Sequence, residues 1–83
     1  MEVNKNIIFR KEFDGSALLF DPESGETFGL NQTSAFLWEQ FAAGADEAQA
    51  LEALKAACND LPADAGAHIA AFAAALRKKK FLF

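Results

Sequence analysis

The chain has 83 residues, which is the length of one domain, and we expect residues 1–83 to form that domain. The formal net charge is −4, so nucleic acid is a poor candidate partner. One cysteine and one histidine exclude an internal disulfide and a zinc set of cysteines and histidines. No apolar run approaches the ~20 residues of a membrane span, and no signal-peptide core occurs near the N-terminus. We therefore expect a cytoplasmic protein without membrane attachment.

The first part of the chain predicts a meander of three short strands. Apolar and charged residues alternate in the first strand, which is typical of a half-buried strand. The turn residues Asp14 and Gly15, and then Pro22 and Gly25, separate the strands. The expected strands cover residues 7–13, 16–21 and 26–30, and the inward side chains of the first are Ile7, Phe9 and Phe13.

The third predicted strand is short and has Gly29 in its interior. Glycine weakens a strand there and often marks the place where another backbone comes close. Of Thr27 and Gly29, we expect one to direct its amide outward and the other to face the second strand. The sequence alone leaves open which does so, because that depends on the pairing register.

Three helices are predicted after the strands. Asn31, Asp46 and Asp64 each suit an N-cap, because a short polar side chain can accept hydrogen bonds from the free amides of a first turn. Gly44 suits the end of the first helix, and Pro62 breaks the chain before the third. The expected helices cover about residues 32–43, 47–59 and 65–80. Their expected inner faces are Ala35, Trp38, Phe41 and Ala42, with Leu37 flanking; Ala50, Leu51, Leu54, Ala57 and Cys58; and Ile69, Phe72, Ala73 and Leu76.

Three strands followed by three helices predict an α+β fold with a three-stranded antiparallel sheet, in outline a winged helix-turn-helix. Trp38 is expected to anchor its core. Seven alanines lie in the third predicted helix. Two explanations are open. Alanine has the highest helix propensity, or its small side chains form the floor of a groove that larger side chains border.

Residues suited to catalysis are sparse. His68 has no triad partner or second metal ligand in the pattern and is expected at the surface or rim, while Cys58 is expected to be a small residue on a helix face. The carboxylates form no paired pattern, and the glycines match no phosphate loop. We therefore expect a binding module and not an enzyme, with no catalytic residue, metal or cofactor.

The basic run at residues 77–80 has two interpretations. It complements the dipole at the C-terminal end of a helix, or it forms a nucleic-acid patch, which makes a small DNA-binding winged helix-turn-helix the alternative function. The third predicted helix presents alanines where a recognition helix presents polar base-reading side chains, which favours the first interpretation. The final Phe-Leu-Phe either folds back on the core or forms a contact in a homodimer.

The stretch "FRKEFDGSALLFDPESGETFGLNQTSAFLWEQFAAG" resembles the PqqD-like family. The later "ACNDLPADAGAHIAAFAAAL" continues the resemblance over nearly the whole chain. In its particular residues the sequence is similar to PqqD-like members of the SynChlorMet radical-SAM cassettes. The residues that carry it in the first stretch are Arg10, Gly15, Leu18, Leu19, Pro22, Leu30, Asn31, Trp38 and Gly44.

This resemblance implies a recognition element for ribosomally made and modified peptides. Such a domain binds the leader of a precursor peptide as an extra strand against its third strand and along its third helix. It then presents the leader to a modifying enzyme, here expected to be a radical-SAM maturase. The resemblance implies peptide contacts by Glu26, Thr27, Phe28, Gly29, Leu30, Ile69, Phe72, Ala73, Leu76 and Lys80.

Two points stay open at this level. A core position is as good an explanation as peptide contact for Phe28, Ile69, Phe72 and Leu76. The alanines at 73 and 74 replace larger apolar residues of the family pattern, which predicts a wider or shallower groove. A weaker third interpretation is a subunit that only scaffolds an enzyme complex.

Overall fold

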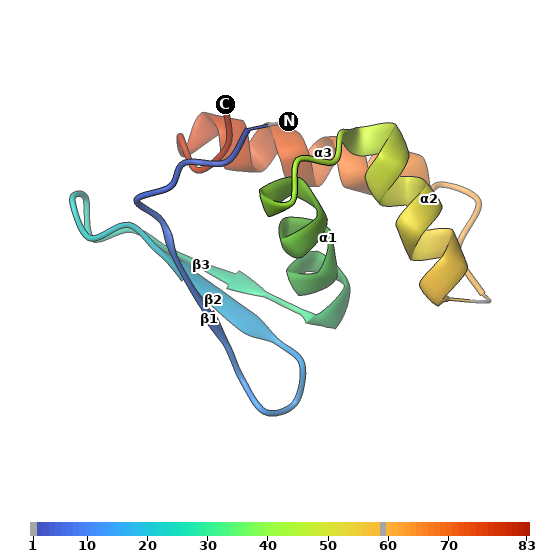
Figure 1. Cartoon of the computed structure of the whole chain (residues 1–83), viewed down its shortest axis with the longest axis horizontal. Coiled ribbons are helices and arrows are strands. Elements are labelled where there is room, and N and C mark those ends of the chain that lie inside the picture. The colour runs from blue at the N-terminus through green and yellow to red at the C-terminus, as the bar shows by residue number, and fades with distance from the viewer. Residues whose placement is uncertain (1, 59) are drawn as a thin grey trace.

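Three antiparallel strands form one sheet in the order β1-β2-β3 in the computed structural model of the protein, which describes residues 2–58 and 60–83 (Figure 1). β1 covers Ile8–Lys11, β2 covers Ala17–Phe20 and β3 covers Thr27–Leu30. The meander is confirmed, with strands shorter than the alternation predicted. Because β2 lies in the middle, β1 and β3 are the two edges of the sheet.

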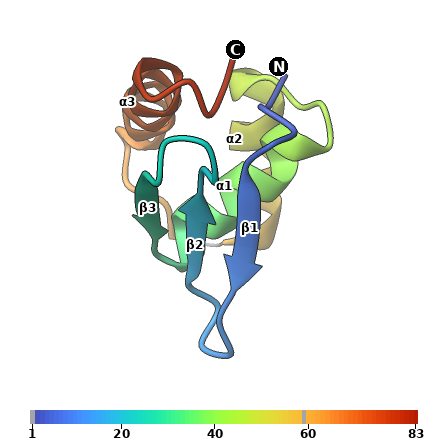
Figure 2. The ribbon, with the colours of Figure 1, turned by 90° about the vertical axis from the view of Figure 1, so that its left-hand side faces the viewer.

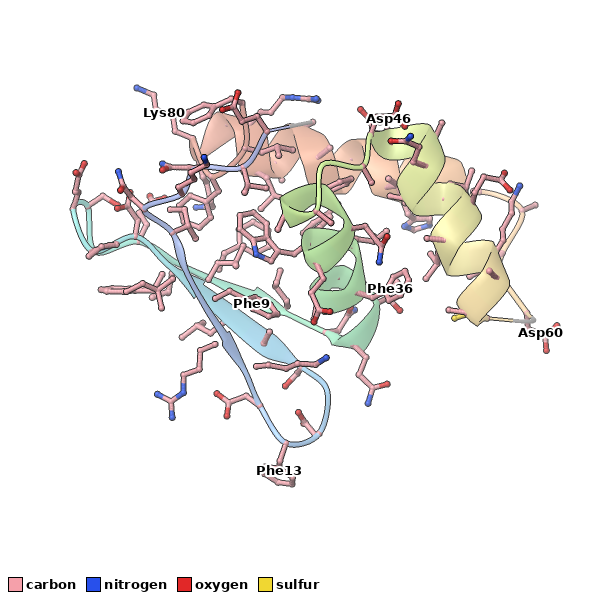
Figure 3. The ribbon with its side chains drawn as sticks, viewed as in Figure 1. Phe9, Phe13, Phe36, Asp46, Asp60 and Lys80 are labelled. Atoms are coloured by element: carbon pink, nitrogen blue, oxygen red, sulfur yellow. The ribbon has the colours of Figure 1, made fainter. Side chains whose placement is uncertain are left out.

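One prediction about the hairpin between β1 and β2, the position of the Phe13 side chain, is wrong. Phe13 was expected on the inner face, yet its side chain is fully exposed at the tip of the hairpin (Figure 3). The reason is that β1 ends at Lys11 and the turn carries Phe13 beyond the helices that cover the sheet. Gly15 has a φ of +91°, a conformation that other residues rarely adopt, so this turn depends on glycine.

A second feature of this turn is its carboxylate. Asp14 accepts hydrogen bonds from the hydroxyl of Ser16 at 2.6 Å and from its backbone amide at 3.0 Å. Both bonds favour the ionised form, so Ser16 holds the pKa of the Asp14 carboxyl below its usual value.

The helices α1, α2 and α3 cover Gln32–Ala42, Glu47–Ala57 and Ala65–Lys78. The Asn31 side chain accepts a hydrogen bond from the Ser34 amide at 2.8 Å, which confirms the first cap. Asp46 and Gln49 form a reciprocal capping box at the start of α2. Asp64 is the N-cap residue of α3, as expected, but the expected side-chain bond is wrong: its carboxylate makes no capping bond and instead lies 3.0 Å from Nε2 of His68.

The core lies where the helices cover one face of the sheet. α1 packs on β3 and on α2, and α2 packs on α3. The expected anchor Trp38 is buried, as are Phe41, Leu54 and Leu76.

Three expected inward positions are exposed: Ala42, Ala57 and Cys58. Ala42 and Ala57 are the last residues of their helices, and Cys58 has an extended backbone that is no longer helical. The apolar periodicity of the sequence therefore continues past the part of each helix that neighbouring elements cover. The predicted end of the second helix, Asn59, lies outside the described residues.

The C-terminal residues fold back on the core. α3 ends at Lys78, two residues earlier than predicted, and Lys80 then takes a φ of +63°, which reverses the chain. Phe81 and Leu82 are buried, and Leu82 forms an isolated β-bridge with Val3. The two ends of the chain consequently lie near each other in both views (Figures 1 and 2).

Candidate functional site

At the outer edge of β3, two residues direct their backbone N–H and C=O groups away from the sheet, where no other strand pairs with them. At the turn, the Asp21 amide donates to the Glu26 carbonyl at 2.9 Å, so this pair is one of the hydrogen-bonded pairs of the β2–β3 ladder. Such pairs alternate with non-bonded pairs along an antiparallel ladder. In the observed register, the next bonded pairs are therefore Leu19 with Phe28 and Ala17 with Leu30.

It follows that Thr27 and Gly29 direct their N–H and C=O groups away from β2. The two residues have the same parity, so both face the open edge, and the expectation that one of them faces the second strand is wrong. Both are exposed, and a Cβ placed on Gly29 would meet nothing within 4 Å. A backbone can therefore approach this edge without obstruction. Unpaired edge groups of this kind are a template for a further strand.

An aromatic surface lies beside this edge. Phe28 of β3 meets Phe72 of α3 edge to face, with ring centroids 6.0 Å apart, and Phe72 stacks on the buried Phe41 at 6.2 Å. Phe28 and Phe72 are both half-buried. They therefore keep part of their apolar surface available between the strand and the helix, while Phe41 supports them from the core. Figure 2 shows α3 and β3 on the same side of the molecule.

The predicted site residues of α3 do not all reach this surface. Phe72 does, and Ile69 lines the hollow described below, but Ala73 and Leu76 are completely buried and lie beneath it in the core. Their contact with a peptide stays a prediction. Lys80 is exposed at the C-terminal end of α3, where Figure 3 labels it.

The face of α3 that borders β3 contains, besides Phe72, residues that the sequence did not single out as site residues. His68 and Phe72 line a hollow at one end of the edge, while Ala75 and Lys79 line a hollow at the other end. These four positions follow one another at spacings of four, three and four residues, which is the repeat of one helix face. Continuing that spacing from Phe72 would have found them, whereas Ala73 and Leu76 belong to the neighbouring, inward face.

The first hollow has a volume of about 560 Å³ and lies beyond the Leu30 end of β3. It reaches from Asn31 to the first half of α3. Its apolar lining comes from all three helices and from the segment before α3: Leu37, Leu54, Leu61, Ala65, Ile69 and Phe72. It is therefore suited to an apolar side chain.

The second hollow also has a volume of about 560 Å³ and lies at the opposite end, where β3 begins. Asp21, Ser24 and Glu26 line it from the hairpin, and Ala75 and residues 78–80 line it from α3. Lys79 Nζ lies 3.4 Å from the Glu26 carboxylate, so one ion pair crosses from helix to strand. The two hollows thus differ in charge: five of the seven residues that line the second are charged, whereas the first combines six apolar side chains with polar ones, among them Asp60 and His68.

No group of three or more histidine, cysteine, aspartate or glutamate side chains in the part of the chain that the structure describes could hold a metal ion. His68 is exposed, as expected, and its partner Asp64 is exposed too. No helix among the described residues is long and apolar enough to cross a membrane. What the arrangement can do is hydrogen-bond an extended backbone and bury the side chains beside it.

Comparisons with known proteins agree with this architecture. The family model "Coenzyme PQQ synthesis protein D (PqqD)" matches residues 16–82. No curated protein matches the chain. One similar solved structure is "TbiB1 in Complex with the TbiA(beta) Leader Peptide", with a TM-score of 0.83 and 20% identity over 99% of this chain and 94% of that one. Another is "Lasso peptide synthetase B1 complexed with the leader peptide", with a TM-score of 0.81 and 24% identity over 99% and 95% of the two chains. At these identities the likeness demonstrates a shared fold.

Proposed function

Because the chain belongs to the PqqD family, we propose that it binds the leader of a ribosomally made precursor peptide as an additional strand beside β3. The observation that carries the proposal is the pair of outward peptide units at Thr27 and Gly29, next to the half-buried rings of Phe28 and Phe72. Strand addition takes affinity from main-chain hydrogen bonds and selectivity from side-chain pockets. This edge offers both.

The structural relatives support this proposal. Both are complexes with a leader peptide, and their fold covers nearly the whole of this chain. The function that follows is recognition and presentation of the guest, without catalysis by this chain. We assign the presenting role toward a radical-SAM maturase because the sequence resembles members of radical-SAM cassettes. The lone, unpaired cysteine suits a reducing cytoplasm.

Duplex DNA is a less suitable ligand than peptide. A recognition helix needs polar side chains on the face that enters the groove of DNA. Four of the exposed positions of α3 are alanine: Ala67, Ala70, Ala71 and Ala74. The basic residues are confined to its last turn, in a chain of net charge −4. A homodimer is no part of this proposal, because Phe81 and Leu82 are buried within the chain itself.

The test removes one outward amide from the edge. Peptides selected from a displayed random library serve as the guest, and their affinities are measured by fluorescence anisotropy. Proline at Gly29 removes an outward N–H, and the open space at this position accommodates the ring. We expect Gly29→Pro to weaken binding by about fivefold or more, because a backbone hydrogen bond is worth about 1 kcal/mol.

The matched control is Lys11→Pro. The Glu12 amide donates to the Ser16 carbonyl at 2.8 Å, so by the same alternation Lys11 faces outward at the opposite edge, on β1. This variant also carries a proline on an edge strand, and it should bind as the parent does. Circular dichroism verifies that both variants fold. If folded Gly29→Pro binds the selected peptides as tightly as Lys11→Pro, the guest does not add to β3.

A further inference from the structure

We call the outer edge of β3, together with the hollows at its two ends, the groove. The two hollows differ in charge, and that difference gives the groove a direction. The hollow beyond Leu30 is bordered by apolar side chains of the three helices, such as Leu54 and Ile69, and its one carboxylate, Asp60, disfavours an acidic guest residue there. The hollow at Glu26 contains three consecutive lysines, Lys78 to Lys80. A guest strand that follows the edge of β3 passes from one hollow to the other.

The charged hollow has a positive excess. Two carboxylates, Asp21 and Glu26, face the three lysines, which leaves a formal charge of +1 by 3 − 2. The Asp21 carboxylate is already engaged by the Glu23 amide at 2.9 Å and by the Ser24 hydroxyl at 3.0 Å. Lys79 pairs with Glu26, and no salt bridge within the described residues involves Lys78 or Lys80.

On the basis of the proposed function, we infer that this groove selects a guest with an apolar residue first and an acidic residue four or six positions later. The order follows from strand direction. β3 runs from the charged hollow at Glu26 toward the apolar hollow at Asn31. An antiparallel guest runs the opposite way, and antiparallel pairing continues the pattern of this sheet and is the more stable arrangement.

The spacing follows from the length of the α3 face. From His68 to Lys79 the helix rises by about 16 Å, at 1.5 Å for each residue. A strand covers the same distance in about five residues, at 3.3 Å each. Side chains that point to the same face of a strand are an even number of positions apart. Four or six positions therefore place both guest side chains toward α3.

Lys79 is the residue that reads the guest carboxylate. Its ammonium group lies 3.4 Å from Glu26 in the free chain, and its side chain is 38% exposed. The guest acid joins or replaces Glu26 as its partner, with Lys78 and Lys80 adding to the positive field. An ion pair that is partly exposed contributes up to about fivefold in affinity, and reversal of one charge adds repulsion to that loss.

The experiment compares peptides selected from a displayed random library by the parent chain, by Lys79→Glu and by Lys55→Glu. Lys55 is the matched control, because it is an exposed lysine in a 3.5 Å pair with Glu52 on α2, away from the groove. The parent and Lys55→Glu should enrich an apolar residue followed by aspartate or glutamate. Lys79→Glu should enrich lysine or arginine at that second position.

A change in the peptide tests the same contact without altering the protein. Replacing the enriched acid of a selected peptide with its amide should weaken binding to the parent by about fivefold, and should strengthen binding to Lys79→Glu. This arm holds even where a protein variant folds poorly, because the parent supplies its own comparison. Equal affinity of the acid and amide peptides for the parent would overturn the inference.

The outcomes separate this inference from the proposed function. If the selected peptides lose affinity to Gly29→Pro but show no acid after the apolar residue, or show the reverse order, strand addition stands and the direction is wrong. If no peptide is enriched, or binding is insensitive to Gly29→Pro, the proposed function itself fails and this inference fails with it.

Discussion

Replacing Phe81 with alanine tests whether the C-terminal residues are part of the fold. The Phe81 ring has no exposed surface and lies 6.4 Å from the ring of Phe28, measured between centroids. Truncating a buried phenylalanine to alanine costs about 3–5 kcal/mol in free energy of unfolding. A chain of this size has a total stability of about 4–12 kcal/mol, so the loss is a large fraction of it.

Thermal and urea unfolding measure that loss. For a domain of this size, 1 kcal/mol corresponds to a shift of about 4–8 °C, so Phe81→Ala should lower the melting temperature by about 12 °C or more. Phe83 is the matched control, since it has the same side chain two positions later and is 63% exposed. Phe83→Ala should change stability by about 0.5 kcal/mol or less. Equal melting temperatures for the two variants would refute the packing of this segment described above.

Three further perturbations test the core, a cap and a turn. Trp38→Ala should cost about 3–5 kcal/mol in urea unfolding because its side chain is buried; an unchanged midpoint would mean that α1 packs with another face. Asp46→Ala should cost about 1 kcal/mol by removing the capping box of α2, whereas Asp64→Ala should cost less because Asp64 makes no capping bond. The ionised Asp14 carboxylate contributes stability that is present above its unfolded pKa and is lost as the pH falls through its lowered folded pKa. In an NMR titration, the pKa of Asp14 should be higher in Ser16→Ala than in the parent. An equal pKa in the two proteins would contradict the hydrogen-bond assignment.

The order of the elements was predictable because its signals are local. Alternation, turn glycines and short polar caps each depend on a few neighbouring residues, and Asn31 and Asp46 act as the sequence indicates. Errors occurred where position depends on what covers a residue. Phe13 and Ala42 fit the periodicity of their elements, yet they lie beyond the packing partners. Periodicity predicts which face of an element is apolar, but not how far along the element other parts of the fold cover that face.

The site was less predictable for a related reason. The third strand and its glycine could be identified from the local sequence. The direction in which the backbone groups of Thr27 and Gly29 point could not, because it depends on the register between β2 and β3. On α3, helical spacing places Ala75 on the face of Phe72, but choosing that face over the face of Ala73 requires the rotation of the helix against β3. The ion pair between Lys79 and Glu26 joins residues 53 positions apart and follows only from the fold.

Residue-resolved amide hydrogen exchange, with and without a selected guest peptide, is the measurement that tests strand addition most directly. Thr27 and Gly29 direct their amides outward, whereas Phe28 and Leu30 are already paired with β2. A guest on this edge should slow exchange at Thr27 and Gly29 and leave Lys11, on the opposite edge, unchanged. If a saturating guest leaves exchange at Thr27 and Gly29 as it is in the free protein, the peptide does not pair with β3.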